Sequence, residues 1–429
     1  PGAQTVLCAA QARLQRDFDG GRLSTELGRR ERFFVLKTEQ KDYEFTSSED
    51  YYAKLGVVPF INAAGTYTAL SASIMPPQVR AAVNRAALVS VDLNELQKAA
   101  GEYLAGRLRC EAALVTSGAA AAMTLATAAC VTHGRREAVL KLPNDLADLP
   151  NEVLIQRDHR YEYDRAIRNC GARLVEVVTL EEYDRAFTPR TAMAHFFNAA
   201  EGGQISREDW VRIAHQHGVP ASNDAAADVP PRSHLWDYTR MGFDLVQFSG
   251  GKGLRGPQNS GLLLGKKSLI EAARLNNSPL IDTLGRAMKV SKEQIVGLVA
   301  AVDWYLSQDE PALEAEFHRR AQLIAAAVQD VPSVETLIFV PPVANHVSHL
   351  LITFDTKLLK MTAREVQDRL RHGNPRIELN PVTGSDRKLM KGLPAGENVI
   401  VVGVWMMLPG EDEIVARRLR EVLSPAGQA

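Results

Sequence analysis

A single lysine stands among small residues in the stretch SGGKGLRGPQNSG, which runs from Ser249 to Gly261. Glycines on both sides of Lys252 leave the backbone with little side-chain cover and give it access to positive φ angles. A flat or bulky ligand could then approach the chain closely, with the lysine amine as a nucleophile. A basic surface turn would have the same composition, so the residues around this stretch must decide between a site and a turn.

Two other groups that could do chemistry lie upstream of the lysine. Thr116, Ser117, Gly118 and Ala119 precede an alanine-rich run, and such a junction at a helix N-terminus can bind an anion through backbone N–H groups. Asp224 ends the stretch PASND, where a carboxylate costs free energy unless it has a partner. The first signal is weak alone, because Ser or Thr before a helix is often only an N-cap.

In chain order, an anion cradle, an aspartate in an apolar strand and a glycine-flanked lysine predict a pyridoxal 5'-phosphate site. Lys252 would form a Schiff base with the cofactor aldehyde, and Asp224 would keep the pyridine nitrogen protonated. The segment Thr116–Ala119 and Ser249 would hold the phosphate. His159, which follows the apolar run EVLIQ, would lie flat against the ring, although alone it would be interpreted as a structural or surface histidine.

The elements that must position these residues alternate along the chain. Apolar strand-like runs at 112–117, 152–156, 173–179, 191–197, 220–226, 244–250 and 260–267 alternate with amphipathic helical runs. This alternation predicts an α/β fold, with a mostly parallel sheet covered by helices on both faces and ligands at the carboxyl ends of the strands. After SKEQIVGLVAAVDWYL, helices mix with short strands, which predicts a smaller α+β domain.

The domain limits expected from this pattern are an N-terminal extension at 1–47, a large cofactor-binding domain at 48–300 and a small domain at 301–429. Residues 48–65 could pack with the small domain. The 50 lysines and arginines balance 51 acidic residues, which gives no electrostatic case for nucleic-acid or membrane binding. The uncharged run at 112–134 is rich in Ala and Thr, and is better explained as a buried strand and helix than as a membrane span.

Four cysteines without a CxxC pair, and histidines without an HExxH motif, argue against a metal site or a disulfide framework. This cysteine usage fits a reducing cytoplasm. We therefore expect a cytoplasmic protein that holds no metal.

Several motifs occur together and in one order along residues 50–425. They are INAAGTYTALSASIMPPQV, VDLNELQKAAGEYLA, ALVTSGAAAA, NEVLIQRDHRYEYDRAI, HGVPASNDAAADVPP, GFDLVQFSGGKGLRGPQNSGLLLG and GRAMKVSKEQIVGLVAAVDWYL. With them the chain resembles the fold-type I pyridoxal-phosphate proteins related to bacterial selenocysteine synthase (seryl-tRNA selenium transferase). Within that group it is most similar to the D-glucosaminate-6-phosphate ammonia-lyase-like branch. One motif would be weak evidence, but the ordered set is specific.

This resemblance implies an aspartate-aminotransferase-like fold and a homodimer or higher oligomer with active sites at subunit interfaces. It places Gly65, Thr66 and Tyr67 near the active site. It also places there Arg286 and Lys289, which would bind an acidic group of the substrate. Arg255 and Arg376 are further substrate-binding candidates, although a surface ion pair explains Arg376 equally well.

The expected reaction is α,β-elimination on a hydroxy-amino acid or amino-sugar acid, giving a 2-oxo acid and ammonia. Lys252 would be the base at Cα, provided that burial or neighbouring cations lower its pKa. Racemisation, γ-elimination with cyclisation, or transfer of a nucleophile would need the same residues and stay open.

Two other classes of function are alternatives. A selenium transferase acting on aminoacyl-tRNA would carry a basic appended domain, and residues 1–47 are shorter than that domain and not convincingly basic. A nucleic-acid partner is therefore not expected. A catalytically idle cofactor-binding protein is disfavoured because Lys252, Asp224 and the cradle occur together.

Overall fold

The structure is a computed structural model of the chain, and it describes residues 50–199, 204–381 and 396–424. The chain divides into two units, Pro1–Val57 and Val58–Ala429. In the first unit the structure describes a short helix, α2 (Tyr51–Lys54), whose N-terminus is capped by Asp50. The extension expected at 1–47 lies outside the described residues. Within those residues, no helix is both long enough and apolar enough to cross a membrane.

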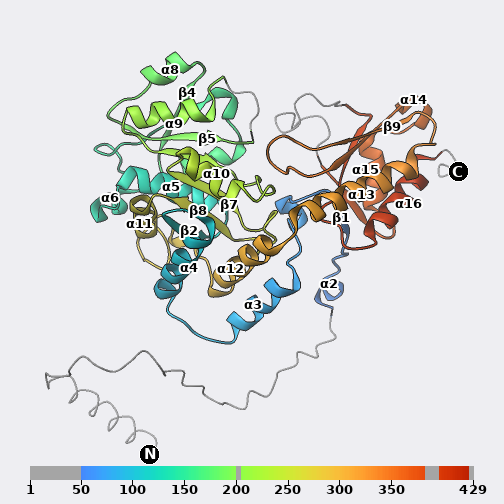
Figure 1. Ribbon diagram of the computed structural model, residues 1–429, viewed down its shortest axis with the longest axis horizontal. Helices are drawn as coiled ribbons and strands as arrows, with labels where there is room; N and C mark the ends of the chain where they lie inside the picture. Colours follow the sequence, from blue (N-terminus) through green and yellow to red (C-terminus); the bar gives the residue numbers. More distant parts are fainter. Residues whose placement is uncertain (1–49, 200–203, 382–395, 425–429) are drawn as a thin grey trace, which may run out of the picture. The chain divides into compact units, whose positions relative to one another are not determined.

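A seven-stranded sheet organises the first part of the larger unit (Figure 1). Its order is β2-β8-β7-β6-β5-β3-β4, and only β8 runs antiparallel to its neighbours. The strands are β2 (Ala112–Thr116), β3 (Glu152–Gln156), β4 (Arg173–Val177), β5 (Thr191–Phe197), β6 (Ala221–Asp224), β7 (Leu245–Ser249) and β8 (Gly261–Gly265). The predicted α/β fold with a mostly parallel sheet is therefore confirmed.

Helices cover both faces of this sheet because its strands are apolar on both faces. On β8, Leu262 and Leu264 join one core with residues of α4 and α12, whereas Leu263 joins another with residues of α5 and α11. Such two-sided cover is typical of parallel sheets. The helices are α3 (Pro77–Ala87), α4 (Leu93–Leu108), α5 (Ala119–Thr132), α6 (Arg136–Lys141), α7 (Arg165–Arg168), α8 (Leu180–Arg185), α9 (Arg207–Gln216), α10 (His234–Met241), α11 (Lys267–Leu275) and α12 (Lys292–Ser307).

A second group of elements surrounds a core of its own. Its antiparallel sheet has the order β12-β10-β9, and a two-stranded parallel sheet joins β1 to β11. The elements are β1 (Ile61–Ala63), α13 (Glu310–Val328), β9 (Val334–Phe339), β10 (His349–Phe354), α14 (Thr356–Leu359), α15 (Ala363–Arg371), β11 (Ile377–Leu379), β12 (Val399–Gly403) and α16 (Glu411–Leu423). Through β1, a segment far upstream in the sequence packs with elements from near the end of the chain. The domain limits given above remain a prediction.

Candidate active site

The carboxyl ends of β2, β5, β6 and β7 meet at one edge of the large sheet. The register aligns Thr116 of β2 with Gly261 of β8, and Gly261 with Ser249 of β7. On the next strand, β6, Asp224 is the last residue and pairs with Phe197 of β5. The sheet therefore brings the predicted cradle, Ser249 and Asp224 to the edge where parallel sheets bind ligands.

The predicted anion cradle is an uncapped helix N-terminus with open space in front of it. Gly118 is the N-cap of α5 and has a φ of 128°, and no side chain caps the first turn. The hydroxyl of Thr116 donates a hydrogen bond to the Gly118 carbonyl at 2.9 Å. A methyl group added to Gly118 would meet no atom within 4 Å, while one added to Gly261 would lie 2.5 Å from the Gly118 carbonyl carbon. Small residues thus leave the N–H groups that follow, together with the half-buried Ser117 and Ala119, accessible to an anion.

Asp224 is buried and accepts two hydrogen bonds. The Tyr161 hydroxyl donates to Oδ2 at 2.5 Å, and the Ala226 N–H donates to Oδ1 at 3.0 Å. Burial raises the pKa of Asp224, whereas these hydrogen bonds and the charge of Lys252 lower it. Burial and the nearby Asp224 hold the pKa of Tyr161 well above its usual value, so the phenol keeps its proton. Tyr161 was missed in the sequence, although it lies two residues after His159 in the same loop.

Lys252 lies in the tight loop that follows β7, and burial lowers its pKa. The glycines beside it are needed for close packing. A methyl group added to Gly251 would lie 2.6 Å from the backbone of Gln258, and one added to Gly253 would lie 1.9 Å from the backbone of Val229. Neither glycine has a positive φ, whereas Arg255 has a φ of 53°. These two glycines therefore serve close packing and do not use the positive φ angles open to them.

A second buried carboxyl group, Asp228, acts electrostatically on the same lysine. The charges of Asp224 and Asp228 both raise the pKa of Lys252, against the effect of burial. Oδ2 of Asp228 accepts hydrogen bonds from the Asn198 amide and, at 3.1 Å, from the Tyr238 hydroxyl. Its other oxygen is buried without a hydrogen-bond partner. Burial raises the pKa of Asp228 to about 6. The sequence signal for Asp228 was an acidic residue within AAADVPP, four positions after Asp224.

His159 is fully buried at the end of β3. Its Nδ1 accepts the Phe197 N–H at 3.2 Å, and its Nε2 lies 3.3 Å from the Gln156 amide nitrogen. The imidazole meets the Phe196 ring edge to face, with 4.4 Å between ring centroids. These contacts fix the ring against the end of β5. The expected stacking of His159 on a cofactor remains a prediction.

The segment around Thr66 and Tyr67 bridges the lysine loop and the second group of elements. The Ser73 hydroxyl donates to the Gly251 carbonyl at 2.7 Å. At the other side, the Tyr67 hydroxyl donates to Oδ1 of Asn380 at 2.8 Å. Thr66 is buried and directly precedes the first of these anchors in the sequence. The segment that carries these two candidate substrate residues is thus tied to the Lys252 loop through Ser73.

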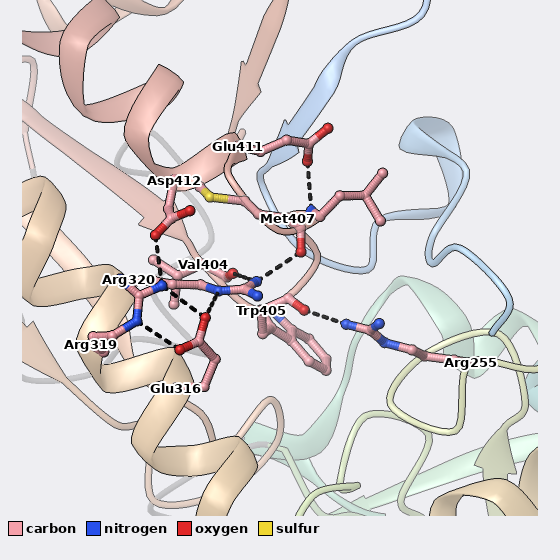
Figure 2. Close-up of polar contacts among 10 residues, drawn as sticks. Arg255, Glu316, Arg319, Arg320, Val404, Trp405, Met407, Glu411 and Asp412 are labelled. Atoms are coloured by element: carbon pink, nitrogen blue, oxygen red, sulfur yellow. Dashed lines mark hydrogen bonds and ion pairs between the residues drawn. The ribbon is translucent and has the colours of Figure 1, made fainter. Parts of the chain in front are cut away.

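The arginine candidates have different surroundings. Arg255 is largely buried and donates to the Trp405 carbonyl at 2.5 Å (Figure 2). Arg376 pairs with the buried Glu378 at 2.6 Å, which fits a structural ion pair. Arg286 and Lys289 are exposed, at and just after a short 3-10 turn. Arg255 and Arg376 are thus both partly buried, and only Arg376 has a carboxylate partner among the described residues, whereas Arg286 and Lys289 lie on the surface.

The described residues contain no cluster of three or more His, Cys, Asp or Glu side chains able to hold a metal ion. What they do bring together is a partly buried lysine of lowered pKa, two buried carboxyl groups and an uncapped helix N-terminus. This set can hold an anion and move a proton at a carbon next to a nitrogen.

Comparisons with known proteins agree with the motif resemblance. A family model described as L-seryl-tRNA selenium transferase matches residues 60–315. The chain is 33% identical over 394 residues to a 5'-C-glycyluridine monooxygenase-decarboxylase from Streptomyces sp, covering 88% of this chain and 93% of that protein. It is 28% identical over 387 residues to D-glucosaminate-6-phosphate ammonia lyase from Salmonella typhimurium, covering 87% of this chain and 98% of that protein.

The solved structures give the same result for the fold. The structure of a D-glucosaminate-6-phosphate ammonia-lyase matches with a TM-score of 0.74 at 28% identity, covering 88% of this chain and 98% of that one. The predicted fold-type I architecture and the predicted relatives are confirmed. The monooxygenase-decarboxylase was not expected from the sequence.

Proposed function

Because the chain belongs to the L-seryl-tRNA selenium transferase family, we propose that it is a pyridoxal-phosphate enzyme that acts on a small amino acid or amino-sugar acid. The reaction that fits best removes the proton at the amino-bearing carbon, expels a hydroxyl group from the next carbon and yields a 2-oxo acid and ammonia. The observation that carries this proposal is the electrostatic grouping of Lys252 with Asp224 and Asp228, at the sheet edge beside the α5 N-terminus.

The residues present fit this cofactor at three points. The first turn of α5 offers N–H groups to a phosphate, and the space in front of Gly118 is open. Asp224 offers a carboxylate to a protonated ring nitrogen, in the position where Tyr161 now donates. Lys252 offers an amine to an aldehyde. When bound, the cofactor supplies an electron sink for negative charge at the substrate Cα.

The protein side of the reaction is proton handling by Lys252. Burial lowers the pKa of its amine, which increases the neutral fraction that can accept a proton from Cα. Asp224 and Asp228 oppose this effect, so they set how far the pKa falls. The protonated Tyr161 keeps Asp224 in place through its hydrogen bond.

A second candidate reaction is oxidative decarboxylation. It is favoured by the 33% identity to the monooxygenase-decarboxylase, which extends over 93% of that protein. Here the substrate would lose its carboxyl group as carbon dioxide, and dioxygen would be the oxidant. The same lysine, aspartate and cradle would serve both reactions, so product analysis must separate them.

The test is to titrate the cofactor-loaded protein with D- and L-hydroxy-amino acids, amino-sugar acids and their phosphate esters. Visible absorption, ammonia, carbon dioxide and dioxygen would be followed in parallel. Lys252→Ala should abolish the absorption change and turnover, and Lys141→Ala, at an exposed ion pair with Asp148, should keep both.

Each outcome points to one reaction. Ammonia without dioxygen uptake supports the elimination, whereas carbon dioxide with dioxygen uptake supports the second candidate. Absorption changes without any of these products would point to racemisation or cyclisation. A wild-type protein that takes up no cofactor would refute the proposal.

A further inference from the structure

Arg255 is a partly buried cation without a counter-charge among the described residues. Its Nη2 donates to the neutral carbonyl of Trp405 at 2.5 Å. No carboxylate among the described residues lies within ion-pair distance of this guanidinium. Burial and the nearby charge of Arg320 lower its pKa to about 10. Removing a charge from water without pairing it is costly.

Two neighbouring arginines, Arg319 and Arg320, differ from Arg255 because they have carboxylate partners (Figure 2). Arg320 donates to Glu316 at 2.8 Å, and Arg319 donates to Glu316 at 2.7 Å and to Asp412 at 2.9 Å. Glu316 and Asp412 are therefore already paired with the two arginines of α13. Arg255 comes from the Lys252 loop and contacts the same segment, residues 404–407, as Arg320, but it has no carboxylate partner there.

A second unsatisfied donor lies on the residue that Arg255 contacts. Trp405 is only 2% exposed, and its indole nitrogen is buried without a hydrogen-bond partner. A buried tryptophan N–H usually has an acceptor. This nitrogen faces the bridging segment, because a methyl group added to Gly65 would lie 3.5 Å from it and 3.8 Å from the Tyr67 ring.

Arg255 belongs to the loop that carries the proposed catalytic lysine, and the segment that faces Trp405 is tied to this loop. The backbone N–H of Arg255 donates to the Lys252 carbonyl at 2.9 Å, within one turn of the loop. The bridging segment is tied to that loop by Ser73, which donates to Gly251, and by Gln258, which donates to the Thr68 carbonyl. An acidic group bound by Arg255 would therefore lie beside the loop that carries Lys252.

We propose that Arg255 and the indole N–H of Trp405 form the recognition site for the carboxylate of the substrate. The inference rests on the proposed function, because it places the acid group of an amino acid beside the lysine that acts on its Cα. One unpaired positive charge matches one carboxylate, and the planar guanidinium suits its two oxygens. A doubly charged phosphate would call for a further cation, and Arg320 is already paired.

The first experiment needs no cofactor. Acetate and its neutral isostere acetamide are added to the cofactor-free protein, with sodium chloride at matched ionic strength. Unfolding temperature and tryptophan fluorescence are recorded. We expect acetate alone to stabilise the wild-type protein and the exposed control Arg212→Gln. The effect should be lost in Arg255→Gln and weakened in Trp405→Phe, which keeps an aromatic ring but lacks the N–H.

The second experiment uses the cofactor-loaded protein, with serine and ethanolamine as a pair that differs by the carboxylate. Arg255→Gln should weaken serine binding about 30-fold or more, as expected for a buried charge pair, and leave ethanolamine binding nearly unchanged. Equal losses for both amines, or no loss for serine, would overturn the assignment. So would a wild-type protein that distinguishes neither acetate from acetamide nor serine from ethanolamine.

Two further points keep the result interpretable. If the Arg255→Gln protein does not fold, the Arg255→Lys protein tests the assignment instead. Lysine keeps the positive charge but lacks the planar guanidinium, so a weaker response to acetate should remain. Failure of the proposed function is a separate result. It would show as absence of cofactor uptake or turnover, whereas the acetate experiment is independent of both.

Discussion

At the scale of single residues, burial and neighbouring charges have opposite effects on the pKa values of the ionisable groups in the site. Lys252, Asp224 and Asp228 influence one another electrostatically in a buried environment. Burial disfavours the charged form of each group, while opposite charges favour it. Asp224 is supported by Tyr161 and a backbone N–H, whereas Asp228 keeps one oxygen without a partner. Burial raises the pKa of Asp228 to about 6, so this group changes its charge close to neutral pH.

This difference predicts a pH-dependent stability for the cofactor-free protein. Burial raises the pKa of Asp228 from 3.8 to about 6 in the folded state. Between these values the folded state binds more protons than the unfolded state, so the contribution of Asp228 to stability falls as the pH rises through this window. Asp228→Asn should remove this pH dependence, which changes the free energy of unfolding by on the order of 1 to 3 kcal/mol between the two pH values.

Chemical unfolding measured between pH 4 and pH 7 checks this expectation. The exposed Asp145→Asn is the control and should leave the slope of the wild-type protein unchanged. A slope identical in wild-type and Asp228→Asn proteins would show that Asp228 ionises at an ordinary pKa. The electrostatic account of the lysine pocket would then need revision.

At the scale of elements, the anion cradle depends on how closely α4 packs against β2, the strand that leads into it. Gly101 lies on the buried side of α4, and a methyl group added there would be 2.4 Å from the Ala113 carbonyl oxygen. Gly106 lies one and a half turns later on an exposed side, where an added methyl group meets nothing within 4 Å. The same helix thus carries two glycines with opposite roles.

Alanine substitution should separate these roles. Gly106→Ala should stabilise the protein by about 0.5 to 1 kcal/mol, because alanine favours helix formation. Gly101→Ala should destabilise it by about 1 to 3 kcal/mol, because α4 must move away from β2. Denaturant unfolding of both variants is the measurement. Equal effects from the two substitutions would mean that helix propensity, and not packing on β2, controls this element.

The sequence predicted the strands of the large sheet well because their apolar runs are clearly bounded. The predicted runs at 112–117, 152–156 and 260–267 contain β2, β3 and β8. Helix α10 (His234–Met241) was not singled out, since it is short and follows two prolines. Propensity and pattern are weak signals over eight residues, where packing decides.

For the site, the sequence indicated the strand-end residues but not the contacts between distant segments. Asp224 ends β6 and Lys252 follows β7, so strand order alone brings them to one edge. The indole of Trp405 and the hydroxyl of Tyr161 reach the site only through tertiary packing. No spacing in the sequence reports that Gly65 would lie beside residue 405. Such pairs require the fold to be known.

At the scale of the whole molecule, several surface features suggest that copies of the chain associate. Leu88, Val89 and Val91 are 63%, 51% and 48% exposed in the segment between α3 and α4, and Ile281 is 76% exposed. Clusters of exposed apolar side chains often mark interaction surfaces. Arg286 lies near Ile281 in the sequence and is itself exposed. We expect a homodimer or higher oligomer in which Arg286 serves the active site of a second copy.

A mixing experiment tests this sharing of residues. Lys252→Ala and Arg286→Ala should each be inactive or nearly so. If each site combines Lys252 of one copy with Arg286 of another, a dissociated and reassembled equal mixture should recover about a quarter of the wild-type activity, because half of the dimers are mixed and each has one intact site. Light scattering establishes the size of the assemblies, and differently tagged chains establish that mixing occurred.

The matched control is a mixture of Lys252→Ala with Asp224→Ala. These residues lie on neighbouring strand ends of one sheet and act on each other electrostatically within one copy, so no exchange of subunits can restore an intact site. Recovery in the first mixture and none in the second would assign Arg286 to the neighbouring copy. Verified mixed assemblies without recovery in either mixture would place Arg286 in the site of its own chain, whereas an Arg286→Ala protein that is active by itself would place Arg286 outside the site. In that case the exposed apolar segment would still predict association, but association would not complete the active site.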